Sequence, residues 1–326
     1  MSYKTTDGLM RHLRDTGIEI SGSTQKRQLV NTGYFHGYKG YRFFKCSDNK
    51  LPFISYDEVY ATIQYDSKLK STLYGKIMFI ETAVKNIALE SIMLNANSES
   101  IYVMYDKVVS GYNNAPFKST EDQKKKFQQN KLNLQNLIQT SLARAYKANN
   151  PKITHYYNNI GYYEVPIWAL FEILTMGDFG YLLSCLTYQV REDISRRIGI
   201  NVSSDTDRQL IYKYIYTLKD LRNAIAHNSV IFDTRFRNID PTRAMKRCLE
   251  QEIGLSYVNF KSISDYVILM CYYLKLLHVS KTDINGFIRE FEKTVNDYKK
   301  VISTDVAAKV IRDDLTNRMQ ILKNFL

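Results

Sequence analysis

The chain has 326 residues, of which 44% are hydrophobic and 24% charged, and its formal net charge is +12. This length and composition are sufficient for a packed core in one large domain or two. The positive charge favours a polyanionic partner, either a nucleic acid or a membrane surface. No segment reaches the roughly 18 uninterrupted apolar residues of a membrane span, and the N-terminus lacks the apolar run of a signal peptide. We therefore expect a cytoplasmic protein without a transmembrane segment.

Metal and cofactor sites are not expected. The four cysteines are scattered without a CxxC spacing, which indicates reduced thiols. The five histidines are equally dispersed, and neither HxxxH nor HExxH occurs. A zinc site therefore lacks a recognisable ligand set, and we predict neither a metal nor a cofactor.

The N-terminal part contains two short helices followed by an aromatic segment. A helix capped near Thr5 is expected to end at Gly17, and a second helix is expected over about residues 24–33. The next stretch, YFHGYKGYRFF (34–44), is rich in glycine and aromatic residues, which favours a loop or a short extended segment. We treat residues 1–54 as an N-terminal helical and aromatic segment.

A long helix is expected next. SYDE (55–58) has the form of a capping box, and a helical pattern continues from it to about Asn95. Apolar residues recur in this stretch at spacings of three and four, as in a helix with one buried face. They are Leu69, Leu73, Ile77, Ile80, Val84 and Ile87.

Helix signals also dominate the middle of the chain. Residues 96–118 look irregular, but TEDQ (120–123) is another capping box and opens a helix that stops before Pro151. Pro166 can occupy the first turn of a further helix, with Gly177 at its end and Asp178 capping the next helix. No stretch shows the alternation of a strand, so the pattern predicts an all-α protein.

The C-terminal part continues in the same way, with helix starts at Ser262 and Thr304 among others. We expect residues 55–254 to form one helical domain. Residues 255–326 are expected to add C-terminal helices that pack on the bundle.

The segment LRNAIAH (221–227) carries the candidate site. At 100° per residue, the helix that contains it has a buried stripe about 80° wide, formed by Ile211, Tyr214, Leu218, Leu221 and Ile225. Arg222 lies at the edge of this stripe, whereas Asn223 and His227 share a nearly opposite face.

Arg222 and His227 are five residues apart, so they point about 140° away from each other on an ideal helix. Three explanations are open. The helix loosens near its end, the length of arginine covers the gap, or a second copy of the chain supplies the missing partner.

Each residue of this segment also has an ordinary structural explanation. His227 can be a histidine that the helix dipole stabilises at the C-terminal end. Arg222 can be a residue at the edge of the core that pairs with a carboxylate, and Asn223 can make a hydrogen bond at the helix end. Taken together with the strong positive charge, the three residues make a catalytic role as plausible as these structural explanations.

The segment resembles a known signature. RNAIAH has the form R-x4-H and is similar to the motif of HEPN-superfamily ribonucleases. Residues 9–41 and 65–89, and VPIWALFEILTMGDFGYLLSCL (165–186), resemble blocks of the Abi-like abortive-infection proteins of the AbiD/AbiF group, in the same order. This chain departs from their pattern at Asn228, where a second histidine is usual. Lysines also replace two arginines of the pattern, at positions 70 and 85.

The resemblance implies an all-α, HEPN-type helical bundle and a toxin of a phage-defence or toxin–antitoxin system. Such proteins cleave RNA without a metal, and some are restrained by a small noncoding RNA. The expected partners are therefore RNA, as substrate or inhibitor, and a second copy of the chain facing the Arg222/His227 surface.

RNA cleavage suits these residues because RNA carries its own nucleophile, the 2′-OH. Histidine exchanges protons near neutral pH, so His227 can take or give one. The guanidinium of Arg222 can stabilise the charge of the phosphorane transition state, and Asn223 can orient the imidazole. Glu81 is a further candidate that can reach Arg222 or His227 across the bundle, although Lys85 offers it an ordinary i,i+4 partner. The products would be a 2′,3′-cyclic phosphate and a 5′-OH.

Several residues are candidates for contact with RNA. A basic cluster on the helix after residue 120 can bind the phosphate backbone, and two tyrosines of the aromatic segment can stack on bases. The candidates are Lys124, Lys125, Lys126, Lys131, Arg235, Tyr34 and Tyr38. The ordinary alternatives are a solvated charged face and a packed aromatic corner.

Two other functions remain open. In the first, the protein is a non-catalytic RNA-binding module of the same fold, and Arg222 and His227 hold phosphate. In the second, it is a helix-turn-helix DNA-binding protein, but no helix has the basic face expected of a recognition helix.

Overall fold

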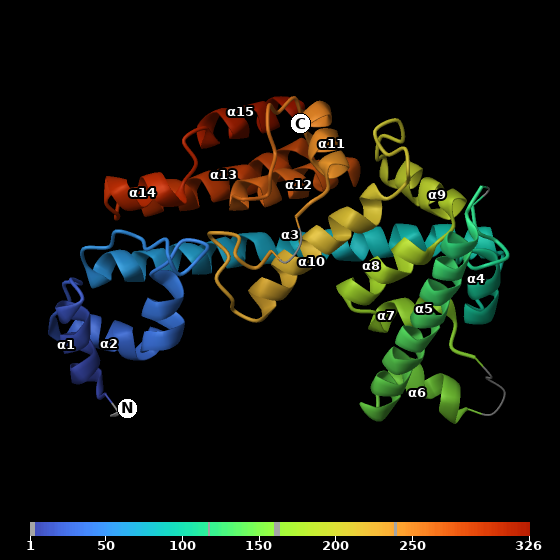
Figure 1. Ribbon diagram of the computed structural model, residues 1–326, viewed down its shortest axis with the longest axis horizontal. Coiled ribbons are helices and arrows are strands. Elements are labelled where there is room, and N and C mark those ends of the chain that lie inside the picture. Colours follow the sequence, from blue (N-terminus) through green and yellow to red (C-terminus); the bar gives the residue numbers. More distant parts are fainter. Residues whose placement is uncertain (1–3, 117, 160–163, 238–239) are drawn as a thin grey trace. The chain divides into compact units, whose positions relative to one another are not determined.

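The computed structural model describes residues 4–116, 118–159, 164–237 and 240–326. In this part of the chain it contains fifteen α-helices and one π-helical segment (Figure 1). Extended pairing among these residues is limited to isolated bridges, such as that between Glu19 and Ser55. The predicted all-α fold is confirmed. Within the described ranges, no helix combines the length and the apolar character needed to cross a bilayer.

The chain divides into two compact units, and the first is built from three separate stretches, residues 1–77, 220–241 and 249–326. The N-terminal segment, the Arg222/His227 motif and the C-terminal helices therefore belong to one unit, and its bounds differ from the three segments expected from the sequence. Elements wholly within it are α1 (Thr6–Asp15), α2 (Gly22–Thr32), η1 (Gly33–Lys39), α12 (Ile263–Leu276), α13 (Lys281–Lys299), α14 (Thr304–Val310) and α15 (Leu315–Phe325).

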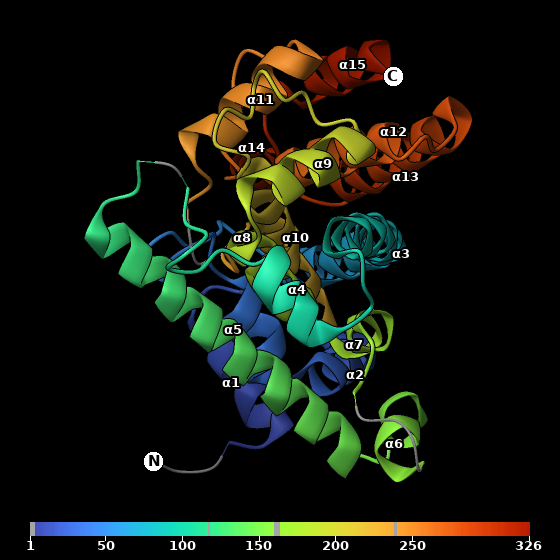
Figure 2. The ribbon, with the colours of Figure 1, turned by 90° about the vertical axis from the view of Figure 1, so that its right-hand side faces the viewer.

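Three helices contribute residues to both units, namely α3 (Tyr56–Ala96), α10 (Leu210–Ala226) and α11 (Arg243–Ile253). The second unit comprises residues 78–219 and 242–248. Its own helices are α4 (Ile101–Lys107), α5 (Glu121–Lys147), α6 (Pro151–Asn158), α7 (Ile167–Ile173), α8 (Met176–Cys185) and α9 (Tyr188–Ile198). In this unit α5 packs against α6, α7 and α8 (Figure 2).

Local sequence signals account for most helix ends. The predicted capping box before α5 is present, because the Thr120 side chain accepts from the Gln123 N–H and the Gln123 side chain accepts from the Thr120 N–H. A second capping box joins Thr175 and Asp178 at the start of α8. The helix break was predicted at Gly177, with Asp178 capping the next helix, but α7 ends at Ile173 and Thr175 caps α8. Because Thr175 begins a new helix, Gly177 lies inside α8.

The stretch 96–118 is less irregular than expected, since α4 lies within it. Ser100 explains this helix, because its side chain accepts from the Val103 N–H and so caps the first turn. After the helix stop expected before Pro151, residues Pro151–Asn158 form α6, whereas residues 160–163 lie outside the described residues.

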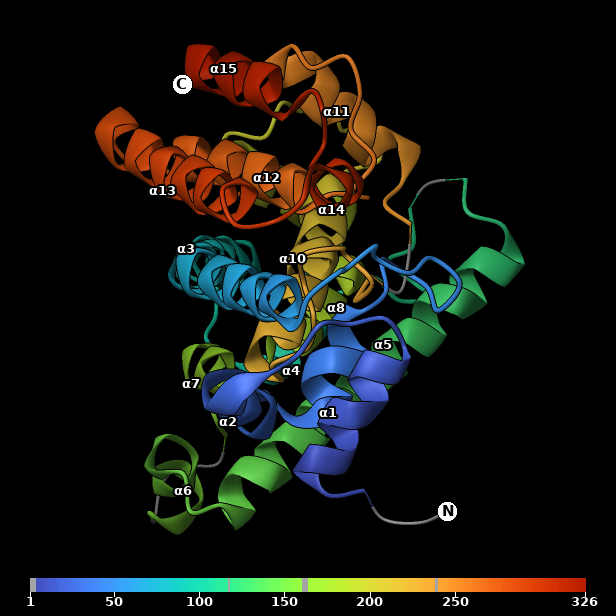
Figure 3. The same ribbon diagram turned by 90° about the vertical axis from the view of Figure 1, so that its left-hand side faces the viewer.

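The apolar stretch near residue 270 is a core helix. In α12 every residue from Ile263 to Leu274 is buried, as expected for a helix that is apolar on all sides and too short to span a membrane. Helices α13 and α15 pack against it (Figure 3). On α13, Tyr298 stacks on Tyr65 of α3, with ring centroids 4.2 Å apart. The C-terminal helices therefore complete the core of the first unit.

The first half of the stretch YFHGYKGYRFF was not predicted correctly, because residues 33–39 form the π-helical segment η1. The stretch ends as expected in an extended segment, where Phe43 forms a bridge with Lys50. Glycine makes the π-helical geometry possible. A Cβ on Gly37 would lie 2.8 Å from Oγ1 of Thr32 and 3.1 Å from its carbonyl oxygen. Thr32 Oγ1 is itself fixed, since it donates to the Gln28 carbonyl at 2.8 Å and lies 3.0 Å from the Tyr56 hydroxyl.

Gly37→Ala is therefore expected to lower the free energy of unfolding by about 1–3 kcal/mol, because the added methyl overpacks the π-helical turn. The matched control is Gly75→Ala on α3, where a Cβ meets nothing within 4 Å. That change is expected to raise stability by about 0.5–1 kcal/mol through helix propensity. Urea unfolding measures both, and equal stability of the two variants would contradict the assigned π-helical turn.

Candidate functional site

The Arg-x4-His segment occupies the C-terminal end of α10. The helix ends at Ala226, and His227 follows as its C-cap. Asn228 adopts a left-handed conformation with φ 51°. Its N–H donates to the Ile225 carbonyl at 3.0 Å, and the Ser229 N–H donates to the Ala224 carbonyl at 2.8 Å. This is a Schellman motif, in which asparagine is the residue best tolerated after glycine.

The Schellman turn bears on the angle between Arg222 and His227. The helix stops before His227. The direction of the His227 imidazole is therefore set by the terminal turn and not by another regular turn of α10. His227 is exposed, and among the described residues its ring has no hydrogen-bond partner. Arg222 and Asn223 are half-buried, and Nη1 of Arg222 donates to Oδ1 of Asn223 at 3.2 Å. The amide of Asn223 thus orients the guanidinium.

A buried carboxylate fixes the chain just after the motif. Asp66 of α3 is fully buried. Its Oδ1 accepts from the N–H groups of Ile231 and Phe232 at 2.8 and 2.7 Å. Its Oδ2 accepts from the Tyr41 hydroxyl and from Nζ of Lys70, both at 2.8 Å.

Burial raises the pKa of Tyr41 well above its ordinary value, and the charge of Asp66 raises it further. The phenol therefore stays protonated and donates. Tyr41 also stacks on Phe232, with ring centroids 6.0 Å apart. Asp66 thus joins the N-terminal aromatic segment, α3 and the segment after α10 into one structure.

Arg235 acts inside this structure. Its Nε donates to Oδ2 of the buried Asp233 at 2.8 Å. Its Nη1 and Nη2 donate to the carbonyls of Gly40 and Phe43 at 2.8 and 2.6 Å. These bonds engage all three guanidinium nitrogens, so we leave Arg235 out of the proposed RNA contacts.

Asn228 links the motif to η1. Its Oδ1 accepts from Nζ of Lys70 at 2.9 Å, and its Nδ2 lies 3.2 Å from Nε2 of His36. Lys70 is buried, whereas His36 is exposed. The structure therefore brings a second histidine to the turn that carries His227.

The aromatic residues of η1 divide into buried and exposed groups. Tyr38 is only 2% exposed, so its ring offers no free face to a base, which agrees with a packed aromatic corner. Tyr34 is half-buried and contacts the rings of Tyr38 and Phe35, with centroids 5.6 and 5.4 Å apart. Phe35 is 79% exposed and is the aromatic side chain of this segment best placed to stack.

The remaining candidates lie in the second unit. Glu81 is buried and its Oε1 lies 2.9 Å from Nζ of Lys85, which is the i,i+4 pair expected from the sequence. A contact of Glu81 with Arg222 or His227 stays a prediction, because Glu81 belongs to the second unit and the other two residues belong to the first. The same holds for the RNA contacts of the α5 lysines. Two of them, Lys125 and Lys126, are exposed.

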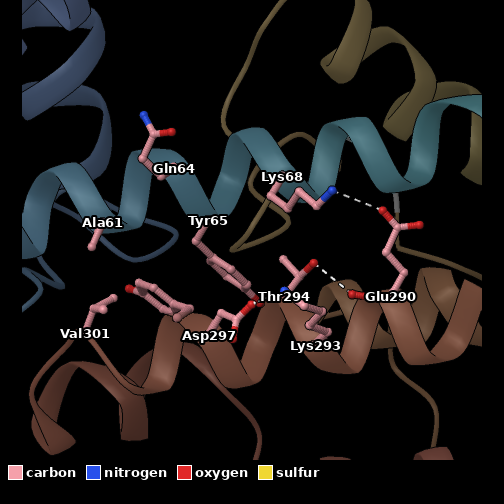
Figure 4. A pocket seen from close by; sticks show the side chains of 10 residues that line it. Ala61, Gln64, Tyr65, Lys68, Glu290, Lys293, Thr294, Asp297 and Val301 are labelled. Atoms are coloured by element: carbon pink, nitrogen blue, oxygen red, sulfur yellow. Dashed lines mark hydrogen bonds and ion pairs between the residues drawn. The ribbon is translucent and has the colours of Figure 1, made fainter.

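A cavity of about 420 Å³ opens between α3 and α13 in the first unit (Figure 4). None of the predicted site residues lines it. Its charged groups pair with each other: Lys68 lies 3.2 Å from Glu290, and Lys293 lies 2.6 Å from Asp297. Within the described ranges, no cluster of three or more histidine, cysteine, aspartate or glutamate residues has the arrangement of a metal site.

The sequence did not single out Lys70, Phe35 or the link between His36 and Asn228. A partial signal existed, since the glycine-rich GYFHGYKGY places one of only five histidines among aromatic residues. Its proximity to Asn228 depends on contacts between positions 192 residues apart.

Comparison with known proteins agrees with the resemblance seen in the sequence. No curated protein and no solved structure matches the chain. A family model described as Abi-like protein matches residues 27–233, a range that includes η1, Asp66, the whole of α10 and the Asn228 turn. Because this match covers more than half of its length, the chain belongs to the Abi-like protein family.

Proposed function

We propose that this protein is a metal-independent endoribonuclease that acts in abortive infection, with Arg222 and His227 as its catalytic residues. Membership of the Abi-like family suggests the role in phage defence. The observation that carries the catalytic part is the exposed imidazole of His227 at the end of α10, which has no hydrogen-bond partner in the described part of the chain and lies one turn beyond a guanidinium held by Asn223.

The chemistry follows from these groups. His227 exchanges a proton with the reacting RNA, and Arg222 stabilises the extra negative charge on the phosphorane. Asn223 acts as a positioning residue because it accepts from the guanidinium. The 2′-oxygen attacks phosphorus and the bond to the 5′-oxygen breaks, which gives a 2′,3′-cyclic phosphate and a 5′-OH.

RNA contact is proposed to involve exposed residues of both units. Phe35 and Tyr34 are available to stack on unpaired bases. Lys125 and Lys126 can bind phosphate, with Lys124 and Lys131 beside them on α5. The net charge of +12 supports a polyanionic ligand. We propose in addition that the protein forms a HEPN-type homodimer through the Arg222/His227 face, and that a small noncoding RNA restrains it.

The test is incubation of the purified full chain with mixed-sequence RNA in EDTA, after the ratio of absorbance at 260 and 280 nm has shown that no cellular RNA remains bound. We expect cleavage that survives EDTA and yields 2′,3′-cyclic phosphate ends. Tight binding without cleavage would instead identify a non-catalytic RNA-binding module. If the protein neither cleaves nor binds the RNA, the proposed function is refuted.

A further inference from the structure

Cleavage by the 2′-OH requires two proton transfers: the attacking hydroxyl loses a proton and the leaving 5′-oxygen gains one. One imidazole cannot hold a proton and accept one at the same moment. Within one chain the Arg-x4-His motif supplies a single histidine, and arginine stays protonated in proteins. The reaction therefore calls for a second group that can accept or donate a proton near His227.

His36 is the histidine that the structure brings to the same turn. Its Nε2 lies 3.2 Å from Nδ2 of Asn228, and Asn228 directly follows His227, with consecutive Cα atoms about 3.8 Å apart. Both histidines are exposed. A substrate phosphate over the turn would therefore have access to both rings.

The orientation of the Asn228 amide follows from its neighbours. The ammonium of Lys70 can only donate, and it lies 2.9 Å from the Asn228 side-chain oxygen. This fixes which end of the Asn228 amide is oxygen, so its NH₂ group faces His36. A nitrogen that receives this N–H must carry a lone pair. Nε2 of His36 is therefore the ring nitrogen placed to accept from this NH₂ group.

Charged and titratable groups surround this arrangement on each neighbouring element. Asp66 and Lys70 lie on α3 and form an ion pair with Nζ and Oδ2 2.8 Å apart. On η1, Nζ of Lys39 lies 5.7 Å from the ring centre of Tyr34. On α1, the ring of His12 lies 6.0 Å from that of Tyr34. Among these groups, Lys70 and its partner Asp66 are joined to His36 through Asn228.

We propose that His36 is a further catalytic residue of this site and serves as the general base. This inference rests on the proposed ribonuclease activity. The lone pair of Nε2 that accepts from Asn228 accepts instead the hydrogen of the 2′-OH. As the 2′-oxygen bonds to phosphorus and the bond to the 5′-oxygen breaks, the leaving oxygen takes a proton from His227. Solvent then returns both rings to their starting states.

The hydrogen bond from Asn228 is long and exposed, so a hydroxyl can replace it at little cost. Phe35 adjoins His36 and is 79% exposed, which suits the stacking of an unpaired base next to the reacting ribose. The proposal therefore specifies single-stranded RNA as the substrate class.

The decisive variant is His36→Gln. Glutamine can still accept from Asn228 through its side-chain oxygen, but it cannot take a proton. We expect cleavage of a fluorescent single-stranded RNA in EDTA to fall by at least about 10²-fold, while binding of the RNA and thermal stability stay unchanged. The matched control is His155→Gln, which changes an exposed histidine of the second unit. This variant should cleave RNA like the wild type.

The pH profile separates a base from a structural contact. The wild-type rate should rise with pH as the base loses its proton and fall as the acid loses its own, and His36→Gln should lose the acidic limb alone. Nitrogen NMR of the histidine rings gives a readout independent of activity: Nε2 of His36 should be unprotonated at pH 8.

The outcomes distinguish the two proposals. If the wild type cleaves and His227→Ala does not, but His36→Gln retains full activity and both limbs, this inference fails and the proposed function stands. A proton on Nε2 of His36 at pH 8 would also overturn it. If the wild type cleaves no RNA, both proposals fall.

Discussion

His227→Ala will lower the rate of RNA cleavage by about 10²–10⁴-fold, the range that general acid–base catalysis supplies. The fold should be unaffected, because His227 is exposed and its ring has no hydrogen-bond partner among the described residues. Its backbone N–H, which donates to the Asn223 carbonyl at 2.9 Å, is retained in alanine. The measurement is the single-turnover rate on RNA in EDTA, with circular dichroism to confirm an unchanged helix content.

Arg222→Lys gives a second measure of the same site. Lysine keeps the positive charge but loses the planar fork that binds two oxygens, so we expect a loss of roughly 10²-fold with RNA binding largely retained. His155→Ala on α6 is the matched control and should retain full activity.

Cleavage by His227→Ala at the wild-type rate would show that the activity arises elsewhere in the protein or from a contaminant.

Asp66→Asn will have the largest effect on stability, with an expected loss of about 3–5 kcal/mol in the free energy of unfolding. The reason is that the change leaves the buried ammonium of Lys70 without its counter-charge. The NH₂ group of the new asparagine would also face a group that now donates to the Asp66 carboxylate, so neither could accept from the other. Urea unfolding measures the loss. Hydrogen exchange should show the local consequence, which is faster exchange of the N–H groups of Ile231 and Phe232.

A double variant keeps this prediction testable if Asp66→Asn does not fold. Combining Asp66→Asn with Lys70→Met removes the uncompensated charge, so the pair of changes should cost less than Asp66→Asn alone. Asp297→Asn is the matched surface control, since Asp297 pairs with exposed lysines and such pairs contribute little. Equal losses at Asp66 and Asp297 would contradict the structural role of the buried carboxylate.

The candidate site illustrates where sequence reasoning stops. Helix α3 and its buried stripe followed from the spacing of Leu69, Leu73 and Ile77, all of them fully buried. In contrast, η1 was missed because a π-helical segment of seven residues is too short to show a repeating apolar pattern and depends on glycines at single positions. The α7–α8 break was predicted at Gly177 and lies instead at Thr175, because a capping threonine outweighed a glycine, and both residues are common at helix ends.

The sequence alone determined that the protein is helical, that it is strongly basic, and that an arginine and a histidine lie five residues apart near a helix end. These are local properties, set by the order of apolar, capping and charged residues along a few turns. The tertiary structure alone decided which side chains are free to react. Arg235 and Tyr38 are taken up by internal contacts, while His36 reaches Asn228 from 192 positions away. Such choices depend on packing between distant segments, and no local pattern encodes them.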